Sequence, residues 1–245
     1  YDIANIGHPM LFAQTYIGTK RIIENYVEEM SECLRYLASS ECITFQLKEK
    51  IQFFEECQKA YGQPALMFSG GATLGLFHTG VCKVLLEQDL MPRVLSGSSA
   101  GAIMTGMLGV SAADKVPELL KGEHFFSDAF KFRKMTELIR GNGGIADVMY
   151  LKKFLMNNLG DVTFAEAYQQ SKRHINIVIA PYNTAQNPRI MNALTAPNVL
   201  VWSAVLASCA VPVLFPPVHV TSKRYDGQHT PYLANTRWVD GSMRS

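Results

Sequence analysis

The residues with the strongest case for chemistry stand in the stretch Gly97-Ser-Ser-Ala-Gly101. A serine with glycine two positions before it and two positions after it is the pattern of a nucleophile elbow, a sharp strand-to-helix turn that exposes the hydroxyl. Ser99 has this spacing, and its neighbours Ser96 and Ser98 do not. The pattern predicts that Ser99 attacks an ester carbonyl and forms an acyl-serine intermediate. Taken alone, the motif also fits a loop rich in glycine and serine.

A second stretch, Ser69-Gly-Gly-Ala-Thr-Leu-Gly75, offers backbone N–H groups rather than side chains. Consecutive residues without bulky side chains let these groups face one point, where they stabilise negative charge. Such a loop serves as a phosphate cradle or as an oxyanion hole. It has neither the GK[ST] ending of a P-loop nor the spacing of a GxGxxG motif. Because the nucleophile turn follows one strand–helix unit later, the residues favour an oxyanion hole.

A serine nucleophile needs a group that accepts its proton. Asp240 precedes a glycine and comes directly after an apolar run, which predicts a carboxylate at the end of a strand. Asp226 also precedes a glycine, but its polar surroundings predict a hairpin turn. We therefore favour Asp240 as the partner of Ser99, although an isolated Asp-Gly pair is more often a turn than a catalytic site.

The histidines leave a second possibility open. A histidine base would need the chain order Ser, Asp, His, and no histidine follows Asp240. Asp161 with His174 or His219 would satisfy that order, but His174 begins a predicted buried strand and His219 follows two prolines. Structural roles are the better interpretation of both, and His78, in the helix after the glycine loop, is predicted to be packed. The residues thus leave a Ser–Asp dyad or a base from outside this chain.

The bulk composition limits the possible partners and cofactors. Of the 245 residues, 48% are hydrophobic and 18% are charged, as in globular proteins. A formal net charge of +2 gives no reason to expect nucleic acid as a partner. No His/Cys cluster has zinc spacing, so we expect neither a metal nor a cofactor. The five cysteines form no CxxC pair, which favours reduced thiols in a compartment facing the cytosol.

Membrane and targeting segments are not indicated. No window of about 18 uninterrupted apolar residues is present, so a transmembrane helix is not predicted. The N-terminus does not resemble a signal peptide. The chain begins at Tyr1 without a methionine and stops at Ser245 soon after an apolar run, so we expect a piece of a longer protein.

The elements that must position the candidate residues change in character at Pro64. Before it, residues 9–60 have a helical pattern, with apolar residues at three- and four-residue spacings over Lys20–Leu37 and again over Phe45–Ala60. We predict that residues 1–63 form a helical segment that packs on the next domain, in preference to a dedicated membrane-binding module.

After Pro64, short apolar runs alternate with helical patterns, which is typical of an α/β sheet with helices on both faces. In this arrangement the turn at Ser99 lies at the carboxyl edge of the sheet. The predicted strands are Ala65–Phe68, Arg93–Ser96, His174–Ala180 and Leu233–Val239, and the predicted helices are Leu76–Gln88, Ala102–Leu108, Asp114–Leu120, Met149–Asn158 and Asn198–Ser208.

Four motifs in this order resemble those of the patatin-like phospholipase family, over roughly Ala65 to the C-terminus. They are the glycine loop, the turn Gly97–Gly101, the run Ala207–Pro217 and Asp240-Gly241. The resemblance implies an α/β fold, namely a patatin-like three-layer α/β/α sandwich with a mostly parallel central sheet, preceded by the N-terminal helical segment. It also implies that residues 64–245 form the catalytic domain, truncated at its C-terminus.

The same resemblance implies roles for individual residues. Members of the family use a Ser–Asp dyad without histidine, which implies Ser99 as the nucleophile and Asp240 as the base. The backbone N–H groups of Gly70, Gly71 and Ala72 would form the oxyanion hole.

Two positions depart from the pattern of most members, which carry an acidic residue before the glycines and an arginine or lysine before the last glycine. Here these positions are Ser69 and Leu74. The variant resembles the branch of fungal and plant storage-lipid triacylglycerol lipases, which also carries a helical segment ahead of the patatin domain. It implies hydrolysis of a neutral glycerolipid, triacylglycerol above all, by a protein peripherally associated with the cytoplasmic side of a membrane or lipid droplet. The alternatives are a phospholipase A, a lysophospholipid acyltransferase and a non-catalytic lipid-surface module.

An aromatic group in the middle of the chain suggests how lipid reaches the site. Its members, interleaved with lysines and an arginine, are Phe125, Phe126, Phe130 and Phe132. Aromatic and cationic residues in alternation suit an interfacial helix or a lid. A helix with a packed aromatic face explains them equally well.

Overall fold

The structure of the protein, a computed structural model, describes residues 20–39, 42, 44–112, 116, 148–183, 186–212 and 214–244. The chain divides into two compact units, Tyr1–Gln63 and Pro64–Ser245. The predicted aromatic lid around Phe125 lies outside the described residues, as does all but one residue of the predicted helix Asp114–Leu120. No helix within the described part of the chain is long and apolar enough to cross a membrane.

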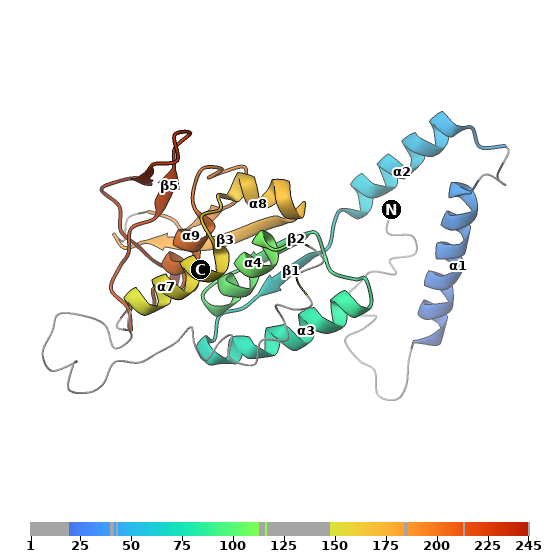
Figure 1. Ribbon diagram of the computed structural model, residues 1–245. Coiled ribbons are helices and arrows are strands. Elements are labelled where there is room, and N and C mark those ends of the chain that lie inside the picture. Colours follow the sequence, from blue (N-terminus) through green and yellow to red (C-terminus); the bar gives the residue numbers. More distant parts are fainter. Residues whose placement is uncertain are drawn as a thin grey trace, which may run out of the picture. The chain divides into compact units, whose positions relative to one another are not determined.

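The described residues of the first unit form two helices, α1 (Arg21–Ala38) and α2 (Leu47–Tyr61) (Figure 1). The predicted N-terminal helical segment is therefore confirmed, with a break between the two helices. Helix α2 begins at a capping box, in which Gln46 and Glu49 each bond to the other's backbone N–H, and it ends at Gly62 with a positive φ of 70°. Both ends follow common capping chemistry, because a side chain satisfies the first free N–H groups and glycine tolerates the final conformation.

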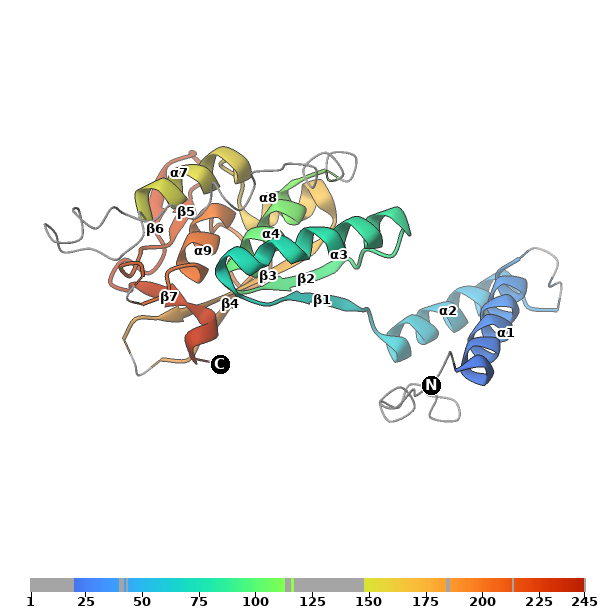
Figure 2. The same cartoon turned by 90° about the horizontal axis from the view of Figure 1, so that it is seen from below.

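The second unit is built on a five-stranded sheet with the order β1-β2-β3-β4, to which β7 is added along β3. Strands β1, β2 and β3 are parallel, whereas β4 and β7 run antiparallel to β3. Figure 2 shows β1, β2 and β3 side by side. The α/β class and the mostly parallel sheet are confirmed. The bounds are β1 Ala65–Phe68, β2 Val94–Gly97, β3 His174–Pro181, β4 Arg189–Met191 and β7 Trp238–Asp240.

The register shows where β7 must lie. Ile179 in β3 pairs with Arg189 of β4 and also with Asp240 of β7. A residue can pair with one neighbour on each edge of its strand, so β4 and β7 occupy opposite edges of β3. On the β7 side, β2 already occupies the edge as far as the pair Ile177–Gly97. Strand β7 therefore continues that edge beyond the end of β2, which brings Asp240 next to the turn that follows Gly97.

Two helices of small and apolar residues form the core over the sheet. Helix α4 (Ala100–Val110) is buried from its first residue to Gly109, and every residue of α9 (Val201–Ser208) is buried. Both contact β3, and α9 also contacts β7. A Cβ on Gly106 of α4 would lie 3.0 Å from the side chain of Val205 in α9, so any larger residue there would push the two helices or this side chain apart. The other α-helices in the described part of this unit are α3 (Leu76–Glu87), α7 (Val148–Leu159) and α8 (Phe164–Ser171).

Two predicted elements have other bounds in the structure, and one hairpin was not predicted. The late strand covers Trp238–Asp240 rather than Leu233–Val239, because Leu233 has a left-handed backbone (φ 51°) and its carbonyl closes a turn with Thr236. Helix α9 begins at Val201 rather than Asn198, because the preceding residues pair with a hairpin that was not predicted as strands. That hairpin consists of β5 (Thr221–Lys223) and β6 (His229–Pro231).

Candidate active site

Ser99 stands in the turn between β2 and α4, so the predicted strand–turn–helix arrangement is present. It is the N-cap residue of α4, with φ 54° and ψ −125°. A non-glycine residue in this region costs of order 1–3 kcal/mol and persists only where its surroundings over-determine it. The strain is a property of a sharp turn that projects one side chain, as a nucleophile elbow does.

The two flanking glycines are required by contacts across the turn. A Cβ on Gly97 would collide with the carbonyl of Gly101 and with the hydroxyl of Thr105. A Cβ on Gly101 would collide with the carbonyl of Phe68, the last residue of β1. The spacing seen in the sequence thus reflects two places where the chain passes against itself without room for a side chain.

The glycine loop passes directly over Ser99. A Cβ on Gly70 would lie 3.1 Å from Cβ and 3.7 Å from Oγ of Ser99. Gly71 (φ 145°) and Ala72 (φ 49°) then turn the chain into the 3₁₀ helix η3 (Ala72–Gly75). Among the hydrogen bonds of the described residues, none uses the N–H groups of Gly70, Gly71 or Ala72 as donors. Three unused donors beside a serine hydroxyl are the arrangement that an oxyanion hole requires.

One side chain forms a hydrogen bond with the first residue of this loop. His78, which was predicted to be packed in the helix, bonds through Nε2 to the carbonyl of Ser69 at 2.9 Å. Because a carbonyl only accepts, the ring nitrogen is the donor. The ring also packs edge-on against Phe68, with 5.2 Å between the ring centroids. His78 thus contacts the start of the glycine loop.

Asp240 is fully buried at the end of β7, and its two oxygens differ in their partners. Oδ1 accepts from the backbone N–H of Ser242 at 2.9 Å, from its hydroxyl at 2.7 Å and from Ser98 Oγ at 3.4 Å. Oδ2 is buried and has no hydrogen-bond partner among the described residues. A buried carboxylate oxygen without a donor is costly, so one is rare unless a partner arrives during function.

All five predicted site residues line one cleft of about 450 Å³. Within the described hydrogen bonds, none joins Ser99 Oγ to Asp240, a pattern familiar from ligand-free active sites in which catalytic bonds shorten only around the substrate. The lining residues are Gly70, Gly71, Ala72, Ser99, Cys209, Val211, Leu214, Phe215, Asp240 and Ser242. Val211, Leu214 and Phe215 give the cleft an apolar wall.

Three residues near the site were not anticipated individually: Ser208, Cys209 and Ser242. The thiol of Cys209 donates to the carbonyl of Ser99 at 3.3 Å. Burial, together with the negative charge of Asp240, raises the pKa of this thiol, which therefore stays neutral and can donate. Ser208 and Cys209 belong to the run Ala207–Pro217, so the motif marked the region without revealing the contacts.

The rival residues lie elsewhere. The carboxylate of Asp161 does pair with a histidine, but with His229, at 2.8 Å, rather than with His174 or His219. Asp226 accepts a hydrogen bond from Gln228 in the turn between β5 and β6, as its surroundings predicted. None of these residues lines the cleft that contains Ser99. The described residues also contain no group of three or more His, Cys, Asp or Glu that could hold a metal ion.

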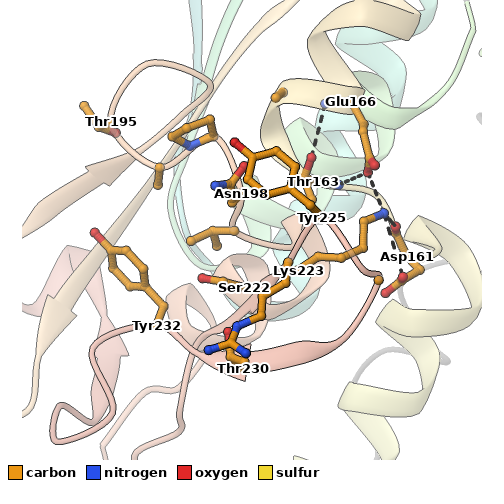
Figure 3. Close-up of a pocket in the computed structure, with 16 residues that line it drawn as sticks. Asp161, Thr163, Glu166, Thr195, Asn198, Ser222, Lys223, Tyr225, Thr230 and Tyr232 are labelled. Atoms are coloured by element: carbon orange, nitrogen blue, oxygen red, sulfur yellow. Dashed lines mark hydrogen bonds and ion pairs between the residues drawn. The ribbon is translucent and has the colours of Figure 1, made fainter.

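A larger hollow of about 710 Å³ lies beside the β5–β6 hairpin (Figure 3). Lys223 is central to it and bonds to Glu166 Oε2 and to the carbonyl of Asp161, each at 2.8 Å. Burial alone would raise the pKa of Glu166, but hydrogen bonds from Lys223 and Thr163 and the charge of Lys223 lower that pKa below its ordinary value of 4.5. The hollow lacks the glycine loop and the strained serine, so its size does not make it the active site.

Comparisons with known proteins match two family models to successive parts of the chain. A family model described as Patatin-like phospholipase matches residues 66–245, and another, described as a domain of unknown function (DUF3336), matches residues 1–59. The chain is 33% identical to "Triacylglycerol lipase ptl2" of Schizosaccharomyces pombe, covering all of this chain and 39% of the relative. It is 36% identical to "Triacylglycerol lipase 4" of Saccharomyces cerevisiae, covering 99% of this chain and 28% of the relative.

The chain therefore spans well under half the length of these curated relatives. Among solved structures, VipD from Legionella pneumophila matches 75% of this chain and 46% of its own, at 15% identity and a TM-score of 0.46.

Proposed function

The chain belongs to the patatin-like phospholipase family, and from this premise we propose that it is a serine hydrolase that cleaves fatty-acyl esters of glycerolipids. The proposal rests on one observation, namely that three chemically distinctive features line the same cleft. The cleft holds a strained serine, three backbone N–H groups without acceptors and a buried carboxylate oxygen without a donor. Each of these groups is costly or unused in the resting protein, and acyl transfer gives a use to all of them.

The reaction assigns one step to each group. Asp240 takes the proton from Ser99 Oγ as that oxygen forms a bond to the ester carbonyl carbon, and the carbonyl oxygen becomes an oxyanion. The N–H groups of Gly70, Gly71 and Ala72 stabilise this charge, at about 3 kcal/mol for each well-aimed donor. The bond to the alcohol oxygen then breaks, and Asp240 returns the proton to the departing alcohol. Water, deprotonated by Asp240, releases the fatty acid from Ser99 by the same steps in reverse order.

The partners of Asp240 support its part in this scheme. Ser242 and Ser98 donate to Oδ1, so that oxygen is held in place. Oδ2 remains for the proton of Ser99. Because one oxygen of Asp240 is held in place and the other accepts the proton, the reaction needs no histidine. This agrees with the absence of histidine from the described lining of the cleft.

Triacylglycerol is the substrate that the observations favour. Val211, Leu214 and Phe215 give the cleft an apolar wall, and none of its described lining residues is cationic. The exposed loop position where most of the family carries a cation is Leu74 here. A neutral ester needs no counter-charge, whereas a phosphate does. Two relatives are named triacylglycerol lipases. We propose that the protein acts at the cytoplasmic surface of a membrane or lipid droplet, where such a substrate is found.

The test compares substrates and variants of the whole protein. Emulsified triolein and phosphatidylcholine vesicles are offered to the wild type, to Ser99→Ala and to Asp240→Asn. We expect hydrolysis of triolein by the wild type, little hydrolysis of phosphatidylcholine, and background rates in both variants. Near-wild-type activity in either variant contradicts the dyad. Preferred release of fatty acid from phosphatidylcholine would instead identify a phospholipase A.

A fluorophosphonate probe separates an inactive fold from an active enzyme with an unexpected substrate. The proposal requires covalent labelling of Ser99, detected by mass spectrometry of the tryptic peptide. An unlabelled wild type that is folded would identify a non-catalytic lipid-surface module.

A further inference from the structure

Three consecutive residues at the C-terminal end of α9, namely Ser208, Cys209 and Ala210, contact the backbone of both members of the proposed dyad. The hydroxyl of Ser208 accepts from the N–H of Ser99 at 3.0 Å. The thiol of Cys209 donates to the carbonyl of Ser99 at 3.3 Å. The carbonyl of Ala210 accepts from the N–H of Asp240 at 3.1 Å. One short segment thus joins the nucleophile turn to the strand end that carries the base.

Ser208 has a second bond that fixes the direction of its hydroxyl. Its Oγ donates to the carbonyl of Val178 in the middle of β3, at 2.7 Å. Because the Val178 carbonyl can only accept and the Ser99 N–H can only donate, the hydroxyl hydrogen must point to β3 and a lone pair to Ser99. The side chain is completely buried. Water therefore cannot replace either bond.

The Ser99 backbone needs such a partner. Ser99 lies beyond the end of β2, so its N–H takes no part in the sheet ladder, and the start of a helix offers that N–H no acceptor within α4. A residue in this conformation relaxes unless its neighbours over-determine it. Ser208 supplies the acceptor for the N–H. The carbonyl accepts from the thiol of Cys209 and from the N–H groups of Ala102 and Ile103.

We propose that Ser208 is a positioning residue for the reaction, which holds the strained backbone of Ser99 in register with Asp240 through its bonds to Ser99 and β3. The proposal rests on the function proposed above. Ser208 is not among the residues that line the cleft, so it acts on the geometry of the nucleophile and not on substrate contact. Its loss lets the Ser99 turn relax, which moves Oγ relative to the glycine-loop amides and to Asp240.

The same helix offers a matched control. Ser203 is also completely buried in α9, and its hydroxyl donates to the carbonyl of Leu200 at 2.9 Å and accepts from the N–H of Thr221 at 3.0 Å. Its partners belong to the start of α9 and to the hairpin rather than to the cleft. Replacing either serine by alanine removes one buried hydroxyl that joins two backbone segments, so the variants lose comparable stability.

The experiment measures kcat and KM on an emulsified or soluble ester for the wild type, Ser208→Ala and Ser203→Ala, at a temperature where thermal melting shows all three to be folded. Ser208→Ala is expected to lose about 100-fold in kcat with KM unchanged, the effect of a misplaced reacting group. Ser203→Ala keeps the wild-type kcat. Equal kcat in the two variants, or a loss in Ser208→Ala that appears only in KM, overturns the proposal.

Hydrogen exchange of the Ser99 amide gives a second readout that does not depend on turnover. We expect slow exchange in the wild type and in Ser203→Ala, and fast exchange in Ser208→Ala. Retained protection in Ser208→Ala overturns the positioning role even if the protein hydrolyses no ester, so failure of the proposed function is seen separately. Ser208→Cys, whose thiol is a weak donor and acceptor, replaces Ser208→Ala if the alanine variant does not fold, with a fall in kcat as the expected result.

Discussion

The hydroxyl of Ser98 donates a 3.4 Å hydrogen bond to Oδ1 of Asp240, although 142 residues separate the two in the chain. Ser99, the adjacent residue, lines the same cleft as Asp240, but no described hydrogen bond joins their side chains. Two neighbouring serines thus have opposite relationships to one carboxylate. The first steadies an oxygen that already has other donors, and the second faces the site where a substrate carbonyl would bind.

The first prediction separates these two serines. Ser98→Ala is expected to keep most of the activity, with a loss below about tenfold, because Ser242 still supplies two donors to Oδ1 and the long bond from Ser98, at 3.4 Å, is worth only about 1 kcal/mol. Esterase rates of Ser98→Ala and Ser99→Ala check it. Inactive Ser98→Ala with an active Ser99→Ala would reverse the assignment of the nucleophile.

The second prediction concerns the space above Ser99. Gly70→Ala places a methyl group 3.1 Å from Ser99 Cβ, so either the loop or the serine must move. We expect a loss of about 100-fold or more in kcat, as when an oxyanion-hole donor is removed. The control is Gly80→Ala in α3, where a Cβ would meet nothing within 4 Å. Alanine there stabilises the helix by about 1 kcal/mol and raises Tm by about 2–4 °C without a change in rate. Normal turnover in Gly70→Ala would show that the loop does not serve the oxyanion.

The third prediction addresses the preference for a neutral lipid. Leu74→Arg introduces a cation beside the glycine loop, where a phosphate of a bound phospholipid would meet it. We expect the ratio of phosphatidylcholine to triolein hydrolysis to rise. Leu90→Arg is the matched control, since Leu74 and Leu90 are 64% and 65% exposed and Leu90 lies outside the glycine loop. If both arginines change the ratio equally, the effect comes from binding to charged interfaces and not from the loop.

The fourth prediction concerns pH and the larger hollow. The pKa of Glu166 is lower in the folded protein than its ordinary value of 4.5, so its pairing with Lys223 stabilises the fold above that pH. This stability is lost as the pH falls through the folded pKa, below 4.5. The urea midpoint of the wild type should therefore exceed that of Glu166→Gln at pH 7, and the gap should narrow below pH 4.5. The exposed pair Lys83–Glu87, 3.9 Å apart, provides a control in Glu87→Gln, for which little difference is expected at either pH. A gap for Glu166→Gln that is constant with pH would contradict the prediction.

Elements with strong local patterns were predictable from the sequence. The strand Ala65–Phe68 has the predicted bounds, and β2 and β3 begin or end within one residue of theirs, because buried apolar runs next to glycine-rich turns are local signals. The three-residue strand β4 and the hairpin strands were missed. Their residues form strands because a neighbouring edge accepts them, and three residues are too few to show alternation.

In the candidate site, too, some features were predictable from the sequence and others were not. Ser99 and the glycine loop were located because steric limits on the backbone leave a local glycine pattern. The bond from Ser99 to Ser208 and the unpartnered oxygen of Asp240 depend on segments more than 100 residues apart, and their chemistry leaves no local pattern. Asp161 shows the same limit, because its histidine partner, His229, lies in a hairpin that was not predicted as strands.

The carbonyl of Phe68, at the end of β1, accepts a hydrogen bond from the N–H of Ser98 and is also the group against which Gly101 packs. The glycine loop and the serine turn therefore form one structural unit, because both adjoin the end of β1. An engineer who grafts the serine turn onto another scaffold must transfer β1 along with β2. A circular permutation that cuts the chain between Phe68 and the glycine loop would disrupt this unit, even with every catalytic side chain retained.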